Sequence, residues 1–477
     1  MFNKRIAAIA VLVALSVSVI GCGDKVPAEN TEKTDTTEKA ENVLPAGILR
    51  SEYGLTFNIL YPNWGLYPNY FFAKEDNTGD VMGKALYERE LKVEEYLGVD
   101  ITNTPVDTIS DVMPAVQQSS MSGEDTYQMV LTHCITAVNA MAADGLVLDL
   151  NTTDINFDKD WWNHSATEAL NVNGKQYYAV SDYMIPDPNC FIFNKDMIEL
   201  YELENPYDLV RDGEWTMDKL NEMISTVTTD NGDQVWDEKD IYGLTTGKTW
   251  YHVSFTYSAG LKLVDKDENG EFSLAFKVDD TSTKLMERID AIFNGPNVWT
   301  YNNNDPAAVF DISTDRCLFN MTSLNTLHTL RDTNVDFGIL PFPKLTEEQN
   351  EYLSNDWSGL LCVPATVNNV EMISDVIELL SYYSNEKVIP TYYDIILGTK
   401  LSRDEDSREM LDIIFNNIVF DAGMNYFGFE KNMQKMFYIA QYAVMTPKQN
   451  NFASVYASYE NGAKAEIASF NELMYDN

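Results

Sequence analysis

Apolar and polar positions form alternating blocks along the first third of the chain, and these blocks predict alternating strands and helices. Residues 57–61 form a short apolar run that is typical of a strand. Positions 82, 86, 93 and 97 are then apolar at helical spacing, and Gly98 is placed as a helix stop. The same order continues with a strand at 99–102, a helix at 111–122 and a strand at 127–132. This rhythm favours a parallel sheet with helices on both faces.

The loops that follow the predicted strands indicate where a ligand would bind. Ligands of such sheets lie beyond the carboxyl ends of the strands. The loop after the first strand contains Trp64 and Tyr67, and the loop after the third begins with His133. Trp64 and Tyr67 are candidates for ligand contact. His133 could donate a hydrogen bond there, or it could be a capped or solvated histidine.

The amino terminus predicts a secreted, lipid-anchored protein. Lys4 and Arg5 precede an apolar run over residues 6–20, which is too short for a comfortable membrane span. Gly21-Cys22 then resembles a bacterial lipoprotein box, which implies a signal peptide over 1–21 and a lipid on Cys22. That lipid would be the protein's sole membrane contact, at the outer face of the cytoplasmic membrane. An ordinary signal anchor or a buried cysteine is the alternative.

Residues 22–50 are rich in Glu, Thr, Lys and Asp and almost free of large apolar groups. Such a segment cannot bury enough surface to order itself, so we expect a flexible tether.

The charge of the chain excludes one class of partner. Lysine and arginine number 33 against 74 acidic residues, which gives a net charge of −41. Such an acidic surface repels phosphate backbones and anionic lipid headgroups, so we expect no nucleic-acid partner. The 4 histidines have no metal-ligand spacing, which makes a histidine-based zinc or iron site improbable.

Three later stretches resemble the family 1 extracellular solute-binding proteins, the receptors that deliver sugars to ABC importers. They are the block 173–220, the stretch FGILPFPKLTEEQNEY from Phe337, and LSRDEDSREMLDIIFNNIVFDAG from Leu401. The resemblance implies a two-lobe periplasmic-binding-protein-like α/β fold of type II. Each lobe would be a mainly parallel sheet flanked by helices. Three crossing segments would form the hinge, at 183–188, 357–364 and 421–426.

The resemblance also implies how the chain divides between the lobes. Lobe 1 would comprise residues 51–185 and 363–420, and lobe 2 residues 186–362 and 421–477.

A tight sugar site needs aromatic plates for the C–H faces of the ring and carboxylates or amides for its hydroxyls. Trp64 and Tyr67 are the candidate plates on lobe 1. The other candidates lie on lobe 2 and on the crossings: Tyr183, Asp187, Trp250, Asn320, Asp356, Trp357 and Tyr426. For any single tryptophan, half-buried packing is the alternative, and we interpret Trp161, Trp162 and Trp215 as structural.

The stretch 229–240 resembles a calcium loop found in some relatives. Asn231, Asp233, Asp237 and Asp240 keep oxygen ligands at the right spacing for a hard cation. Thr229 replaces the first Asp and Gln234 replaces the Gly of the sharp turn, so a solvated acidic turn is the alternative. The similar stretch at Asp265 is better explained as a β-hairpin.

The sequence therefore predicts a monomeric, lipid-anchored receptor that captures a sugar or oligosaccharide and delivers it to ABC permease subunits. We expect no enzymatic activity, because no nucleophile elbow, Walker loop or dinucleotide-binding motif is present. A surface-anchored carbohydrate-active enzyme and a ligand sensor for a membrane kinase are the alternatives.

Overall fold

The computed structural model describes residues 44, 47–65, 70–73, 80–133, 136, 138–237, 239–247, 251–301, 316–330, 335–357, 359–398, 405–445 and 450–475. The fold below is that of the unit formed by residues 45–477. Three predicted functional residues lie outside the described residues: Cys22, Tyr67 and Trp250.

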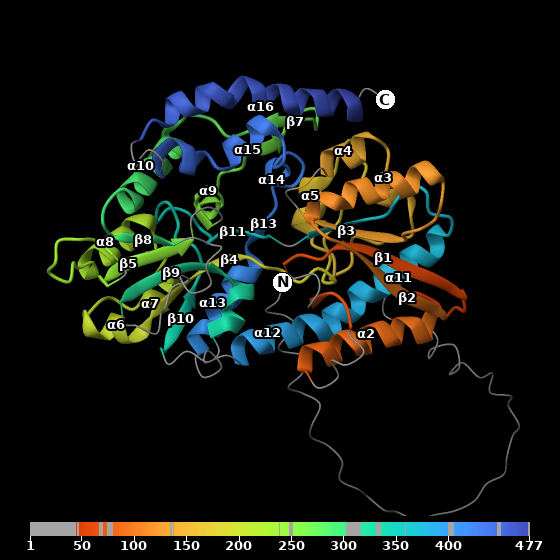
Figure 1. Ribbon diagram of the computed structural model, residues 1–477, viewed down its shortest axis with the longest axis horizontal. Coiled ribbons are helices and arrows are strands. Elements are labelled where there is room, and N and C mark those ends of the chain that lie inside the picture. Colours follow the sequence, from red (N-terminus) through yellow and green to blue (C-terminus); the bar gives the residue numbers. More distant parts are fainter. Residues whose placement is uncertain are drawn as a thin grey trace, which may run out of the picture. The chain divides into compact units, whose positions relative to one another are not determined.

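The first sheet has the strand order β12-β3-β1-β2 (Figure 1). Its strands are β1 (Leu55–Pro62), β2 (Val99–Val106), β3 (Met129–His133) and β12 (Gly359–Cys362). Strand β1 is parallel to both β2 and β3, whereas β12 is antiparallel to β3. The three strands predicted from the amino-terminal pattern are therefore confirmed as neighbours in one sheet.

Two helices predicted beside this sheet are present, with the expected stops. Helix α2 (Val81–Leu97) starts at Asp80, whose Oδ2 accepts from the Gly83 N–H at 3.1 Å. It ends at Gly98, which has a left-handed φ of 58°. A Cβ at Gly98 would lie 2.5 Å from Glu52 Oε2, so only glycine fits this turn. Helix α3 (Val112–Ser122) ends in the same way at Gly123.

Shorter helices and a long one complete the surroundings of the first sheet: α4 (Val138–Ala143), α5 (His164–Leu170) and α11 (Val370–Tyr383). Trp161 and Trp162 precede α5 and are buried, and Glu378 of α11 accepts a 2.6 Å hydrogen bond from Trp161 Nε1. Both tryptophans therefore pack inside the protein.

The second sheet has the order β10-β4-β9-β5-β8. Its strands are β4 (Asn189–Asn194), β5 (Tyr242–Gly247), β8 (Val298–Tyr301), β9 (Cys317–Ser323) and β10 (Phe337–Leu340). Strand β5 is parallel to β8 and β9, but β4 is antiparallel to β9 and β10. The expected parallel character thus holds for the first sheet, while the second is evenly mixed.

The core of the second sheet is aromatic. Trp215 is fully buried, and its indole N–H donates to the Pro341 carbonyl at 3.0 Å. Its ring lies 5.3 Å from Phe319 and 6.1 Å from Phe191. The structural interpretation of Trp215 therefore agrees with its burial. The helices near this sheet are α6 (Lys195–Leu200), α7 (Pro206–Asp212), α8 (Met217–Val227), α9 (Ser254–Ser258) and α10 (Asp280–Phe293).

The remaining elements join the two sheets or follow them. Strand β11 (Ser354–Asn355) pairs in parallel with β13 (Ile418–Val419), so the segments that lead into the second and third crossings run side by side. Strands β6 (Val264–Lys266) and β7 (Phe272–Leu274) form the hairpin predicted at Asp265. The last helices are α12 (Ile389–Gly398), α13 (Glu405–Asn416), α14 (Ala422–Asn425), α15 (Lys431–Phe437) and α16 (Phe452–Tyr475).

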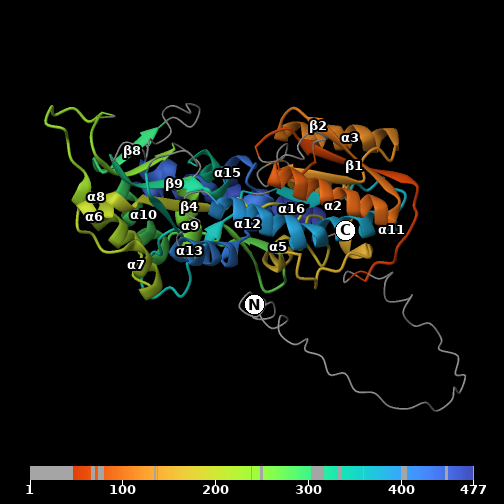
Figure 2. The same cartoon turned by 90° about the horizontal axis from the view of Figure 1, so that it is seen from below.

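Two segments lie elsewhere than the predicted lobe boundaries place them. Strand β12 pairs within the first sheet, although residues 359–362 were expected in lobe 2. Helix α13 packs on β10 of the second sheet, although 405–416 was expected in lobe 1. Between them, α12 lies beside α2 in both views (Figures 1 and 2). One apolar core includes Leu86 of α2, Tyr392 of α12 and Phe337 of β10.

Within the part of the chain described, no helix combines the length and the apolar character needed to cross a membrane.

Candidate functional site

Aromatic side chains from four separate segments meet at the end of the first sheet. Trp64 follows β1, His133 ends β3, and Trp357 precedes β12. The Trp64 and His133 rings are 5.0 Å apart edge to face, and the His133 and Trp357 rings are 6.4 Å apart and stacked. Phe437 of α15 packs edge-on to Trp357 at 5.9 Å. We call these four residues the aromatic group.

The aromatic group forms because strands β1 and β3 are parallel and their carboxyl ends therefore meet at one edge. Trp64 remains 50% exposed, so its ring offers a face to solvent. His133 is buried, and burial lowers its pKa to about 4. It is therefore a neutral imidazole at neutral pH, and it contacts Trp64 and Trp357 as a flat ring rather than as a cation.

Two carboxylates lie next to the aromatic group on the first and second crossings. The Asp187 N–H donates to Asp356 Oδ1 at 2.8 Å, and the Trp357 N–H donates to the Asp187 carbonyl at 3.4 Å. Asp187 Oδ1 accepts from the Asn325 N–H at 2.9 Å. The first and second crossings are thus hydrogen-bonded to each other through Asp187, Asp356 and Trp357, which were all predicted ligand residues.

The environment of Asp187 makes it an unusual acid. Burial is the main cause that raises its pKa to about 7, and the nearby charge of Asp356 acts in the same direction. Hydrogen bonds from the Asn325 N–H and Ser323 oppose the rise only in part. Asp187 therefore gains a carboxylate's full acceptor capacity only near and above neutral pH.

Two tyrosines that lie near Asp187 were not predicted from the sequence. The Tyr70 and Tyr392 rings are 5.7 Å apart edge to face, and Asp187 is near enough for its charge to raise the pKa of both, after burial as the main cause. Tyr70 precedes α2, and Tyr392 belongs to α12. Tyr392 occupies an apolar position of a helical pattern, which by itself predicts only a core residue.

Three other predicted ligand residues use their polar groups inside the protein. The Asn320 amide donates to Thr245 Oγ1 at 2.8 Å within the second sheet. The Tyr183 hydroxyl donates to the Phe71 carbonyl at 3.3 Å, and the Tyr426 hydroxyl donates to the Leu170 carbonyl at 2.9 Å. All three side chains are almost completely buried, so the structure does not bring them to the aromatic group as open ligand contacts.

The candidate calcium residues cap local turns. Asp240 Oδ1 accepts from the Asn231 N–H at 2.9 Å, and Asp240 Oδ2 accepts from the Asp237 N–H at 2.7 Å. Asp233 Oδ1 accepts from the Val235 N–H at 2.8 Å. Among the residues with described positions, no group of three or more acidic, histidine or cysteine side chains is arranged to hold a metal. Gln234 takes the left-handed conformation, with φ 66°, at the place where related loops have glycine.

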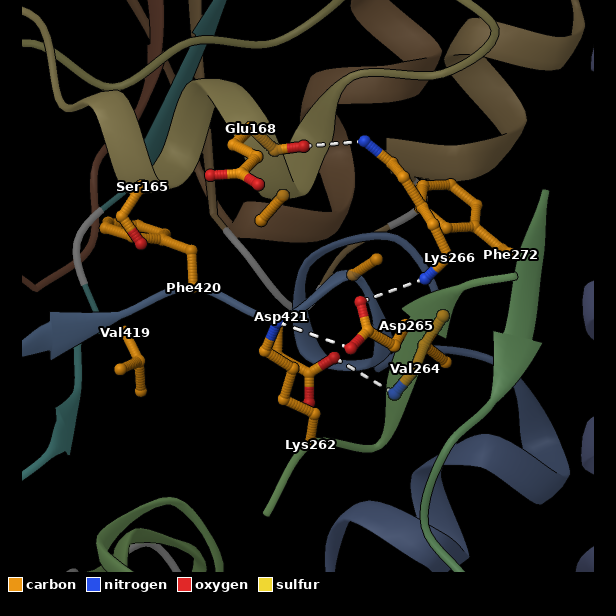
Figure 3. A pocket seen from close by; sticks show the side chains of 12 residues that line it. Ser165, Glu168, Lys262, Val264, Asp265, Lys266, Phe272, Val419, Phe420 and Asp421 are labelled. Carbon is orange, nitrogen blue, oxygen red and sulfur yellow. Dashed lines mark hydrogen bonds and ion pairs between the residues drawn. The ribbon is translucent and has the colours of Figure 1, made fainter. Parts of the chain in front are cut away.

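A separate cavity of about 240 Å³ borders the third crossing (Figure 3). It lies between α5, the β6–β7 hairpin and residues 419–422, and it contains none of the predicted ligand residues. Its lysines are already engaged, since Lys266 Nζ donates to the Glu168 carbonyl at 2.7 Å and Lys262 Nζ lies 3.6 Å from Asp265. Asp421 accepts from the backbone N–H groups of residues 263, 264 and 423.

The chain matches known proteins in structure but not in sequence. No protein-family model matches the chain, and no curated protein is similar to it in sequence. Solved structures do match. The cyclic alpha-maltosyl-1,6-maltose binding protein from Arthrobacter globiformis has a TM-score of 0.59 at 13% identity, over 87% of this chain and 99% of that one.

The chain has the fold of ABC sugar-binding proteins. The ABC substrate-binding protein from Listeria monocytogenes in complex with cycloalternan matches with a TM-score of 0.56 at 12% identity, over 87% of this chain and 99% of that one. The binding protein from B. animalis subsp. lactis in complex with beta-1,6-galactobiose has a TM-score of 0.57 at 11% identity, over 87% and 98%. The predicted two-lobe fold is therefore confirmed.

Proposed function

We propose that this chain is an extracellular receptor that binds a mono- or oligosaccharide between its two lobes and delivers it to an ABC importer. The observation that carries the proposal is the aromatic group beside Asp187 and Asp356. Trp64 and His133 come from the ends of β1 and β3, and Asp187, Asp356 and Trp357 come from two crossing segments, which is where a ligand can contact both lobes.

The chemistry of this place suits a neutral sugar. An exposed indole such as Trp64 offers a flat apolar face for the C–H surface of a pyranose ring. Asp187 can accept from sugar hydroxyls once it is ionised. A chain with a net charge of −41 repels anionic ligands, which a neutral sugar avoids.

Ligand capture would follow from a shift between open and closed arrangements of the lobes. A sugar that contacts both lobes only when they are closed stabilises the closed state by its differential affinity. The paired strands β11 and β13 and the first crossing at Asp187 are the segments about which the lobes would move. The importer would then recognise the closed shape.

A titration of intrinsic tryptophan emission tests the binding function, because Trp64 and Trp357 lie at the proposed site. We expect a saturable change with at least one member of a panel that includes maltose, mannobiose and beta-1,6-galactobiose. Trp64→Ala should abolish most of the response. Trp236→Ala, which removes a tryptophan that is 43% exposed on the 230–240 loop, should leave the affinity unchanged. A response to peptides or polyamines alone would reject the sugar assignment.

The anchor and the transport role need their own tests. We propose that Cys22 carries the lipid, so Cys22→Ser should release the protein from the cell surface into the medium. Stimulation of importer ATPase activity by the sugar-loaded receptor would support the partner. Incubation with oligosaccharides should leave them intact, and release of a product would favour the carbohydrate-active enzyme instead.

A further inference from the structure

The hydroxyl group of Tyr392 is buried without a hydrogen-bond partner among the described residues. The side chain is 2% exposed, and its oxygen has no hydrogen-bond partner among the residues that the structure describes. Leaving a buried hydroxyl unpaired costs about 1–3 kcal/mol. A tyrosine at this position therefore carries a cost that phenylalanine would avoid, and the cost calls for an explanation outside packing.

The Tyr392 ring has both apolar and polar neighbours. It shares an apolar core with Val388, Leu411 and Phe337. Tyr70 packs on it edge to face at 5.7 Å, and the charge of Asp187 acts on its hydroxyl. Asp187 and Tyr70 both retain partial exposure, so a ligand can reach these two neighbours of Tyr392.

A wide helical turn fixes where Tyr392 lies. Helices α11 and α12 are joined by a π-helical turn over Ser384–Val388, and such turns are frequent at functional sites. Arg89 donates to Ser384 Oγ at 3.2 Å and to the Phe71 carbonyl at 2.5 Å. Its guanidinium lies 4.5 Å from the centre of the Tyr183 ring on the first crossing. The buried arginine thus connects the turn before α12 to the segment that carries Tyr70 and to the crossing that leads to Asp187.

We propose that Tyr392, Tyr70 and Asp187 form a subsite that binds one hydroxyl group of the sugar. A sugar hydroxyl donates and accepts at once, so it can donate to the Asp187 carboxylate and accept from the Tyr392 hydroxyl. A ligand that lacks this hydroxyl leaves the tyrosine unpaired, which makes Tyr392 a specificity-determining residue. The inference rests on the proposed function and adds a contact that the sequence did not indicate.

Tyr392→Phe tests the subsite, because it removes only the oxygen. The probe is whichever of maltose, mannobiose and beta-1,6-galactobiose the wild type binds, and the dissociation constant and thermal midpoint are both measured. We expect the affinity to fall about fivefold to tenfold while the thermal midpoint stays the same or rises. The matched control is Tyr393→Phe, whose hydroxyl donates to Asp412 Oδ1 at 2.7 Å on the surface. It should leave the affinity unchanged.

The outcomes distinguish this inference from the function on which it rests. An unchanged affinity in Tyr392→Phe overturns the subsite while the receptor function stands. A thermal midpoint lowered by several degrees also overturns it, since the hydroxyl would then have a partner inside the fold. If the wild type binds none of the three sugars, both the proposed function and the subsite are rejected.

Discussion

The pKa of Asp187 makes sugar binding depend on pH, with a direction that the structure fixes. In the free protein, burial raises this pKa to about 7, so near neutral pH about half of the molecules hold a neutral carboxylic acid. Sugar hydroxyls that donate to Asp187 favour its ionised form, so binding lowers the pKa and releases a proton. Affinity should therefore rise with pH as the carboxyl group of the free protein ionises.

The magnitude follows from the same value. If the sugar binds only the ionised form, the apparent dissociation constant is multiplied by one plus the ratio of protonated to ionised protein. With a pKa of about 7, this factor is about 11 at pH 6 and about 1.1 at pH 8, a difference of roughly tenfold. The neutral imidazole of His133, with a pKa of about 4, stays unprotonated over this range and adds no term.

Calorimetric titrations at pH 6, 7 and 8, in buffers of different ionisation enthalpy, measure both the affinity and the proton release. The comparison is with Asp187→Asn, which should bind more weakly but with little dependence on pH. The matched control is Asp100→Asn, which removes an exposed carboxylate on β2 and should keep the wild-type profile. Equal affinities of the wild type at pH 6 and 8, or a pH dependence that persists in Asp187→Asn, would show that ionisation of Asp187 does not control sugar binding.

Three further predictions concern stability. The raised pKa of Asp187 means that the folded protein holds a proton that the unfolded chain has lost. As the pH rises from the ordinary carboxyl pKa to about 7, the free energy of unfolding of the wild type should therefore fall, relative to that of Asp187→Asn, by up to about 1.4 kcal/mol per pH unit. Urea unfolding at several pH values measures this difference, and parallel pH profiles of the two proteins would contradict it. Trp215→Ala should lower the free energy of unfolding by about 3–5 kcal/mol, because it empties a fully buried site, and a loss below about 1 kcal/mol would show that the site collapses. Gly98→Ala should lower the free energy of unfolding by at least about 1 kcal/mol, because its φ is 58° and the new Cβ would meet Glu52. The control Gly145→Ala, with φ 68° and no atom within 4 Å of the new Cβ, measures the cost of the left-handed backbone alone. Equal losses of stability in the two variants would show that the contact with Glu52 contributes nothing.

The sequence predicted those parts of the fold that depend on local pattern. Helix α2 and its stop at Gly98, the three parallel strands and the β6–β7 hairpin follow from periodicity and turn residues that lie close together in the chain. Trp64 was predicted to border the cleft because it lies in a loop at a strand end, and Trp357 because it lies at a crossing; the His133 ring contacts both.

The remainder of the site depends on contacts between distant segments. Tyr183 and Tyr426 lie on predicted crossings, yet their hydroxyls bind carbonyls 112 and 256 residues away. Asn320 faces β5, a strand partner that no local pattern identifies. The local pattern predicts only that Tyr392 is a core residue. Its contact with Tyr70 and its hydroxyl without a hydrogen-bond partner are seen only in the folded structure.

In the proposed receptor, two lobes close around a sugar that is later released unchanged. Small-angle X-ray scattering of the full chain, with and without the sugar that gives the largest fluorescence response, tests it most directly. We expect a smaller radius of gyration with the sugar, recovery of the original value after dialysis, and an intact sugar in the dialysate. Identical scattering curves at saturating sugar, or a sugar recovered in cleaved form, would contradict it.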